Sequence, residues 1–104
     1  MLSLHDLALE TETQFSALSR ETWRLQSSRV FDEKSFRGGF ALEYTSRDRR
    51  LTLVYSEMQF EAQVDGREVF GPTQHPSFSG NQFSFDNFAK YLPQILEATF
   101  NALA

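Results

Sequence analysis

Histidine and cysteine, the residues that most often bind metals or act as nucleophiles, are scarce in this sequence of 104 residues. It contains two histidines and no cysteine, which excludes thiolate metal sites, disulfides and a cysteine nucleophile. His5 and His75 are also too far apart for the H-x-x-x-H spacing that places two ligands on one helix face. We therefore expect no metal site, and His75 stays conceivable as a general base.

Glycine patterns that bind phosphate or position a nucleophile are missing as well. The sequence has no P-loop, no G-x-G-x-x-G fingerprint and no G-x-S-x-G elbow. Gly38 and Gly39 precede an alternating pattern rather than a helical one, so we expect them to give the backbone the freedom for a turn. The prediction is a protein that is not an enzyme, with no catalytic residue and no cofactor.

Three glutamates are the next candidates for chemistry. Glu57, Glu61 and Glu68 fall on or near neighbouring predicted strands, where an outward sheet face would hold them. Paired carboxylates can perform acid–base catalysis, but alternating Glu and Gln also suit a solvated strand face, which is the simpler interpretation. As a binding surface, the glutamates would complement a basic partner.

Arginines gather at a predicted hairpin tip. They are Arg47, Arg49 and Arg50, and they could form a basic patch for phosphate or for an acidic protein surface. Other basic residues lie near them in the sequence: Arg24, Arg29, Lys34 and Arg37. Asp48 interrupts the run and no RNA-binding signature accompanies it, so a charged turn is the simpler interpretation. Fourteen acidic residues against ten basic ones disfavour nucleic acid as the main partner and favour a basic protein.

Phenylalanine is abundant, with 11 residues, and we expect it to dominate the core. Residues 71–82 are polar, with two prolines and two glycines, and predict a long loop with phenylalanines within it and on both sides. Either the loop folds back and buries these rings, or some are exposed as anchors for a partner. The partner-binding candidates are Phe70, His75, Phe78 and Phe83, together with Glu57, Glu61 and Glu68.

Helical spacing of apolar residues predicts one helix near each end of the sequence. The first covers about residues 4–20 and opens with a capping box formed by Ser3 and Asp6, although Thr11 interrupts its apolar face. The second follows an N-cap at Asp86, and Pro93 predicts a kink or break in it, because proline lacks the amide hydrogen.

Alternation of apolar and polar residues predicts four or five strands between the helices. A first short strand begins at Thr22, residues 27–39 are expected to be irregular, and later strands begin near Phe40 and Leu51. The alternation continues past a bend at 56–57, which leaves open whether one long strand or two are present.

Asp65-Gly66 is the strongest local signal, because both positions of a type I′ turn need positive φ. A hairpin there pairs Ala62 with Val69 and turns Phe70 to the other side of the sheet.

The short connections between strands predict an antiparallel meander with both helices on one face, forming a single α+β domain over residues 1–104. The sequence has no signal-peptide pattern and no apolar stretch long enough to cross a membrane, so we expect a cytoplasmic protein.

A small acidic domain of this kind most economically binds another protein. We expect a stoichiometric inhibitor, comparable to an immunity protein or an antitoxin, that covers the active site of a basic target. One alternative is a secretion chaperone or adaptor that holds an extended segment at an apolar face or a sheet edge, and a homodimer would favour it. A small-ligand protein or enzyme with a Phe-lined pocket near Tyr44, Tyr55 or His75 also stays open, as does a nucleic-acid binder.

Overall fold

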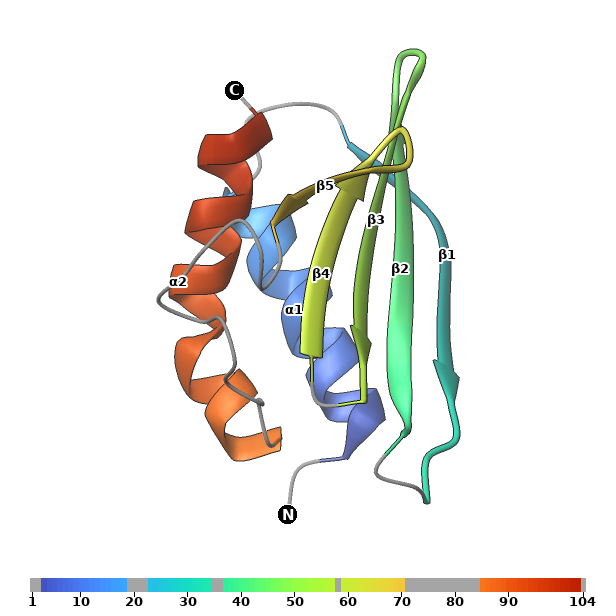
Figure 1. Cartoon of the computed structure of the whole chain (residues 1–104), viewed down its shortest axis with the longest axis vertical. Coiled ribbons are helices and arrows are strands. Elements are labelled where there is room, and N and C mark those ends of the chain that lie inside the picture. The colour runs from blue at the N-terminus through green and yellow to red at the C-terminus, as the bar shows by residue number, and fades with distance from the viewer. Residues whose placement is uncertain (1–2, 19–22, 35–36, 58, 71–84, 104) are drawn as a thin grey trace.

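A computed structural model gives the structure of the chain and describes residues 3–18, 23–34, 37–57, 59–70 and 85–103. The elements in chain order are α1 (Leu4–Leu18), β1 (Arg24–Phe31), β2 (Gly39–Ser46), β3 (Arg49–Ser56), β4 (Gln59–Val64), β5 (Arg67–Phe70) and α2 (Phe85–Leu103). The strands form one antiparallel sheet in the order β1-β2-β3-β4-β5, and both helices lie on the same side of it (Figure 1). The predicted α+β meander is therefore confirmed, with five strands.

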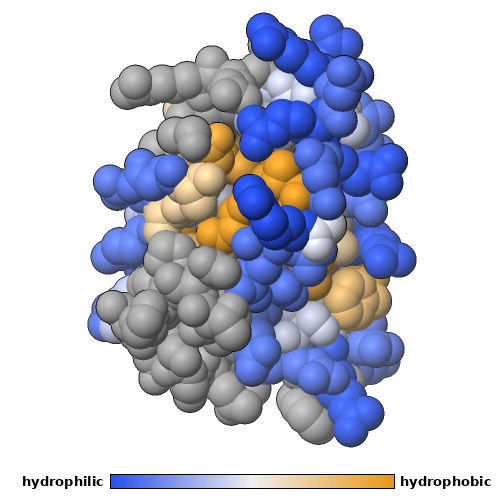
Figure 2. Space-filling view, turned by 45° about the horizontal axis from the view of Figure 1, so that its top comes forward, coloured by the Kyte–Doolittle hydropathy of each residue, from blue (hydrophilic) through white to orange (hydrophobic). Residues whose placement is uncertain are grey.

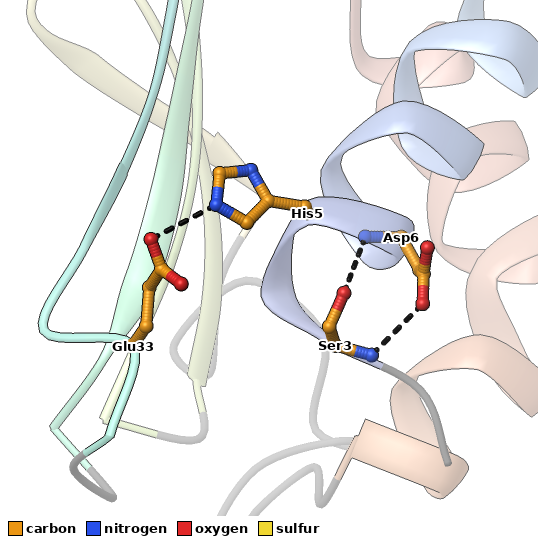
Figure 3. A network of polar contacts seen from close by, with 4 residues as sticks. All are labelled: Ser3, His5, Asp6 and Glu33. Atoms are coloured by element: carbon orange, nitrogen blue, oxygen red, sulfur yellow. Dashed lines mark hydrogen bonds and ion pairs between the residues drawn. The ribbon is translucent and has the colours of Figure 1, made fainter.

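The first turn of α1 is held by the cap that the sequence predicts (Figure 3). The backbone N–H of Ser3 donates to Asp6 Oδ2 at 3.1 Å, and that of Asp6 donates to Ser3 Oγ at 3.1 Å. The bond that the Ser3 backbone donates to the Asp6 carboxylate, and after it the Ser3 hydroxyl, lower the pKa of Asp6 from its ordinary value. His5 Nε2 lies 2.9 Å from Glu33 Oε1, which links the first turn to the segment that follows β1.

The core lies between the two helices and the sheet face that they cover. Strand residues of this face alternate with exposed or half-exposed ones, as in β3, where every second residue is buried. Thr11 and Thr99 are fully buried, and each hydroxyl donates to the carbonyl four residues earlier, at 2.7 Å and 2.9 Å. Thr11 therefore continues the buried stripe of α1, because its hydroxyl is satisfied within the helix.

Aromatic rings hold α2 on the sheet. The Phe88 ring centroid lies 4.6 Å from that of Tyr55, 5.5 Å from Phe60 and 5.9 Å from Phe40. All four side chains are at most 1% exposed, so the predicted phenylalanine core is confirmed around Phe88.

Residues with positive φ form the connections between strands. Arg47 has φ 57°, Glu57 has φ 52°, and Asp65 and Gly66 have φ 52° and 84°. The last pair confirms the predicted type I′ turn, since both central residues are left-handed. The bend at 56–57 is a hairpin turn as well: Ser56 pairs with Gln59, so β3 and β4 are separate antiparallel strands.

Strand β1 is longer than predicted, and the expected irregularity from residue 27 is wrong for residues 27–31. The register of β1 against β2 shifts between Leu25 and Ser27, which makes Gln26 an extra residue. Such a bulge moves all later side chains to the other face, so a regular alternation cannot be read across it.

A second register shift corrects the prediction for β5. Ala62 pairs with Phe70 instead of Val69, because the register shifts between Ala62 and Gln63. Phe70 therefore lies on the covered face, where it is 1% exposed and its ring centroid is 5.8 Å from that of Phe60.

Helix α2 continues through Pro93, so of the predicted kink or break the break is wrong. The helix runs from Phe85 to Leu103 with Pro93 inside it, and Asp86 is its second residue rather than its N-cap. Pro93 is exposed, whereas Leu92, Ile95 and Leu96 are fully buried on either side of it. Packing of these leucine and isoleucine side chains holds the helix across the missing amide hydrogen.

One end of the helix–sheet layer shows apolar side chains at the surface. Figure 2 shows them near the centre of the view, with hydrophilic side chains to their left and right. Partly buried residues that pack against the core include Trp23, Val69 and Phe100. The rim of the core is thus only partly covered, and the Arg49 guanidinium lies over the Trp23 ring at 5.7 Å from its centroid.

Candidate functional site

The side of the sheet opposite the helices, here called the uncovered face, is the candidate site. The cross-strand register places its side chains in rows. One row crosses four strands and consists of Arg29, Ala41, Val54 and Glu61. The next row crosses all five strands and consists of Ser27, Glu43, Thr52, Gln63 and Glu68.

Two of the three predicted glutamates, Glu61 and Glu68, lie on the β4–β5 side of the uncovered face. Glu68 pairs with Gln63, and Gln63 is two residues after Glu61 in β4. Glu61 and Glu68 are therefore diagonal neighbours, whose Cα atoms are typically about 7–8 Å apart. Gln63 Nε2 donates to Glu61 Oε1 at 3.1 Å. Glu57 is exposed in the turn before β4. We call Glu57, Glu61 and Glu68 the acidic side.

The arginines of the predicted hairpin patch do not form one surface. Strand alternation sends Arg49 to the covered side, over Trp23, and Arg50 to the uncovered face, while Arg47 lies in the turn. The patch expected from their sequence proximity is therefore divided. The uncovered face instead carries arginines at its other edge, where Arg24 and Arg29 lie in β1.

The aromatic candidates separate into two groups. Phe70 is buried in the core, so the interpretation that this stretch packs inside holds for it and for Phe88. His75, Phe78 and Phe83 lie outside the described residues.

The tyrosines named for a ligand pocket are part of the packed core. Tyr44 is 2% exposed, and Tyr55 is fully buried. Burial raises the pKa of Tyr55 to about 12, and burial together with the charge of Glu12 raises the pKa of Tyr44 further. Both phenols therefore stay protonated near neutral pH and cannot act as general bases.

Comparisons with known proteins do not identify a functional site in this chain. Family models, curated proteins and solved structures give no match to this chain. Among the described residues, no three His, Asp or Glu side chains are grouped so that they could hold a metal ion. Neither described helix combines the length and the hydrophobicity that a membrane span needs.

Sequence reasoning missed the exposure of β1. Residues 24–29 of this strand are all exposed, including Leu25 at 37%, and among the described strands only β2 pairs with β1. The two ends of the strand show an apolar–polar pattern, but the bulge at Gln26 interrupts it. We call residues 24–31, with the side of the strand that faces away from β2, the β1 edge.

Replacing Tyr44 with phenylalanine is expected to raise the free energy of unfolding by about 1 kcal/mol. The Tyr44 hydroxyl is buried and has no hydrogen-bond partner within the described residues. Removing it therefore also removes the free-energy cost of burying a hydroxyl without a partner. Urea unfolding measures the change. Tyr44→Leu also removes the ring, whose centroid is 4.5 Å from that of Phe15, and should lower stability. A less stable Tyr44→Phe would show that the hydroxyl is satisfied.

Proposed function

We propose that the chain is a protein-binding module and, within that class, a stoichiometric inhibitor whose acidic side covers a basic surface of its target. The observation that carries this proposal is the position of Glu61 and Glu68. They are diagonal neighbours on a sheet face that neither helix covers. Carboxylates in this arrangement attract a basic partner during encounter and fix its orientation, which favours fast and specific association.

The alternatives with other chemistry have less support from the described residues. A nucleic-acid surface built on Arg47, Arg49 and Arg50 loses its continuity, because Arg49 and Arg50 lie on opposite sides of the sheet. A ligand pocket using Tyr44 and Tyr55 would have to open the packed core.

A second candidate within the binding class is an adaptor or chaperone that holds an extended segment of another protein. The exposed β1 edge favours it, because the outer side of an edge strand offers unpaired backbone groups to an added strand.

Affinity capture with a charge-reversed variant tests the inhibitor proposal. Glu61→Lys combined with Glu68→Lys changes the acidic side, and Glu10→Lys combined with Glu97→Lys makes the same charge change on exposed positions of the helices. We expect the wild type and the helix variant to retain one protein in a 1:1 complex and to inhibit it, and the sheet variant to lose both effects. Equal retention by all three proteins would show that the acidic side is not the binding surface.

A further inference from the structure

The β1 edge differs from the opposite edge of the sheet in length and in cover. β1 has eight residues and only its last two are partly buried, whereas β5 has four residues and lies against α2. A strand added to the sheet needs a long edge with accessible backbone groups. The β1 edge is therefore the side on which the sheet can be extended.

The bulge at Gln26 brings two arginines to the same face of this edge. Arg24 and Arg29 are five residues apart, a spacing that would place them on opposite faces of a regular strand. Their pairing with Thr45 and Ala41 shows that both lie on the uncovered face. If the extra residue Gln26 is not counted, Arg24 and Arg29 are positions i and i+4 of a strand.

The opposite side of the β1 edge is apolar at two positions. Leu25 pairs with Tyr44 and Val30 pairs with Phe40, and both of these partners belong to the covered face. Leu25 is 37% exposed, and Val30 packs partly against the core. A strand beside β1 would therefore meet arginines on one face and apolar side chains on the other.

A second copy of this chain fits the edge poorly. Two β1 strands centred on Arg29 would bring identical charges opposite one another, which is destabilising. In the antiparallel register that pairs residue 24 with residue 31, Ser27 would face Ser28 of the other copy. These two residues point to different faces in this strand, because Ser27 pairs with Glu43 and Ser28 pairs with Leu42.

We propose that the β1 edge binds an extended acidic segment of a partner protein, which joins the sheet as a sixth strand. Acidic side chains of that segment, four positions apart, face Arg24 and Arg29, and apolar side chains at adjacent positions, on the other face of the segment, face Leu25 and Val30. Main-chain hydrogen bonds hold the segment, and the charge pattern selects it. This inference rests on the proposed role in protein binding and names a site and a partner chemistry for it.

A defined peptide tests the edge without knowledge of the natural partner. The probe is fluorescein-labelled Thr-Val-Glu-Val-Thr-Val-Glu-Val-Thr, capped at its carboxyl end, and fluorescence anisotropy measures its affinity for the full chain. Two control peptides carry lysine for both glutamates, or N-methyl groups on alternate amides. We expect the acidic probe to bind at least about tenfold more tightly than either control, because one control repels the arginines and the other cannot pair as a strand.

Charge reversal of single arginines locates the binding. Arg29→Glu should weaken binding of the acidic probe about tenfold, while Arg67→Glu, an equal change on the opposite edge strand, should leave it within about twofold. Circular dichroism confirms that both variants fold. Amide chemical-shift changes on titration should centre on residues 24–31.

Four outcomes would overturn the inference. If the lysine peptide bound as tightly as the acidic probe, the argument from charge would fail. If the N-methylated peptide bound as tightly, the argument from strand pairing would fail. Shift changes centred on Glu61 and Glu68 would place the site elsewhere. Light scattering that shows a dimer broken by Arg29→Glu would identify the occupant as a second copy. None of these results affects the capture experiment on the acidic side, so failure of the edge and failure of the protein-binding role are distinguishable.

Discussion

Truncation of Phe88 to alanine is expected to lower the free energy of unfolding by about 3–5 kcal/mol. Its ring joins α2 to three strands through contacts with Phe40, Tyr55 and Phe60, at centroid distances of 4.6–5.9 Å. The rings around the resulting cavity are fixed by their own strands and cannot collapse into it. Since small domains are stable by only about 5–15 kcal/mol, the variant should be partly unfolded at moderate urea concentrations.

Phe31→Ala is the matched control for this truncation. Phe31 lies in β1 on the uncovered side and is only partly buried, with the Arg29 guanidinium 5.9 Å from its ring centroid. Its removal should cost about 1 kcal/mol, because only part of the ring leaves an apolar environment. Urea unfolding followed by far-UV circular dichroism compares the two. Equal losses would mean that Phe88 does not anchor α2.

The second large effect is expected at Gly39, where alanine should cost about 3 kcal/mol or more. A Cβ atom at this position would collide with the backbone carbonyl of Tyr55 on the neighbouring strand β3. Gly39 is the first residue of β2 and pairs with both Phe31 and Ser56, so the backbone around it cannot move aside as the end of a flexible side chain can. The variant therefore either separates β2 from β3 locally or does not fold.

Gly66→Ala separates this steric effect from the general cost of losing glycine. Nothing lies within 4 Å of a Cβ at Gly66, but its φ of 84° disfavours a side chain. A loss of about 1–2 kcal/mol is expected there. Thermal unfolding of the two variants gives the comparison, and a Gly39→Ala protein as stable as Gly66→Ala would contradict the close approach of β2 and β3.

These glycines also show what the sequence could not reveal. Gly38 and Gly39 were expected to supply the freedom for a turn, yet among the described glycines only Gly66 has positive φ. At Gly38 a Cβ would collide with the Asp32 carbonyl, so both positions are needed for close approach. Such an approach depends on how distant segments pack, which local sequence does not contain.

The predicted elements that proved correct depend on local chemistry. The Ser3–Asp6 cap, the Asp65-Gly66 turn and the order of the strands follow from residues close together in sequence. Both helices were expected on one face because the sheet has one apolar face, and that face must be buried.

The two errors of strand register have the same physical cause. A bulge at Gln26 concealed the second half of β1, and a bulge near Gln63 turned Phe70 into the core. A single extra residue reverses the faces of all that follow, and neither bulge is marked by glycine or proline. Of the candidate site, the shared face of Glu61 and Glu68 was predictable from alternation. The β1 edge was not, because its exposure depends on which strands the helices cover.

The position of α2 after the sheet in the chain affects how the protein emerges during synthesis. Every strand pairs with its neighbour in sequence, so the meander can form by closing short loops as each hairpin is made. The rings of Phe40, Tyr55 and Phe60 then have no cover on the α2 side until Phe88 has been synthesised. A nascent chain that stops before α2 would present this aromatic surface to water, which makes it a substrate for molecular chaperones.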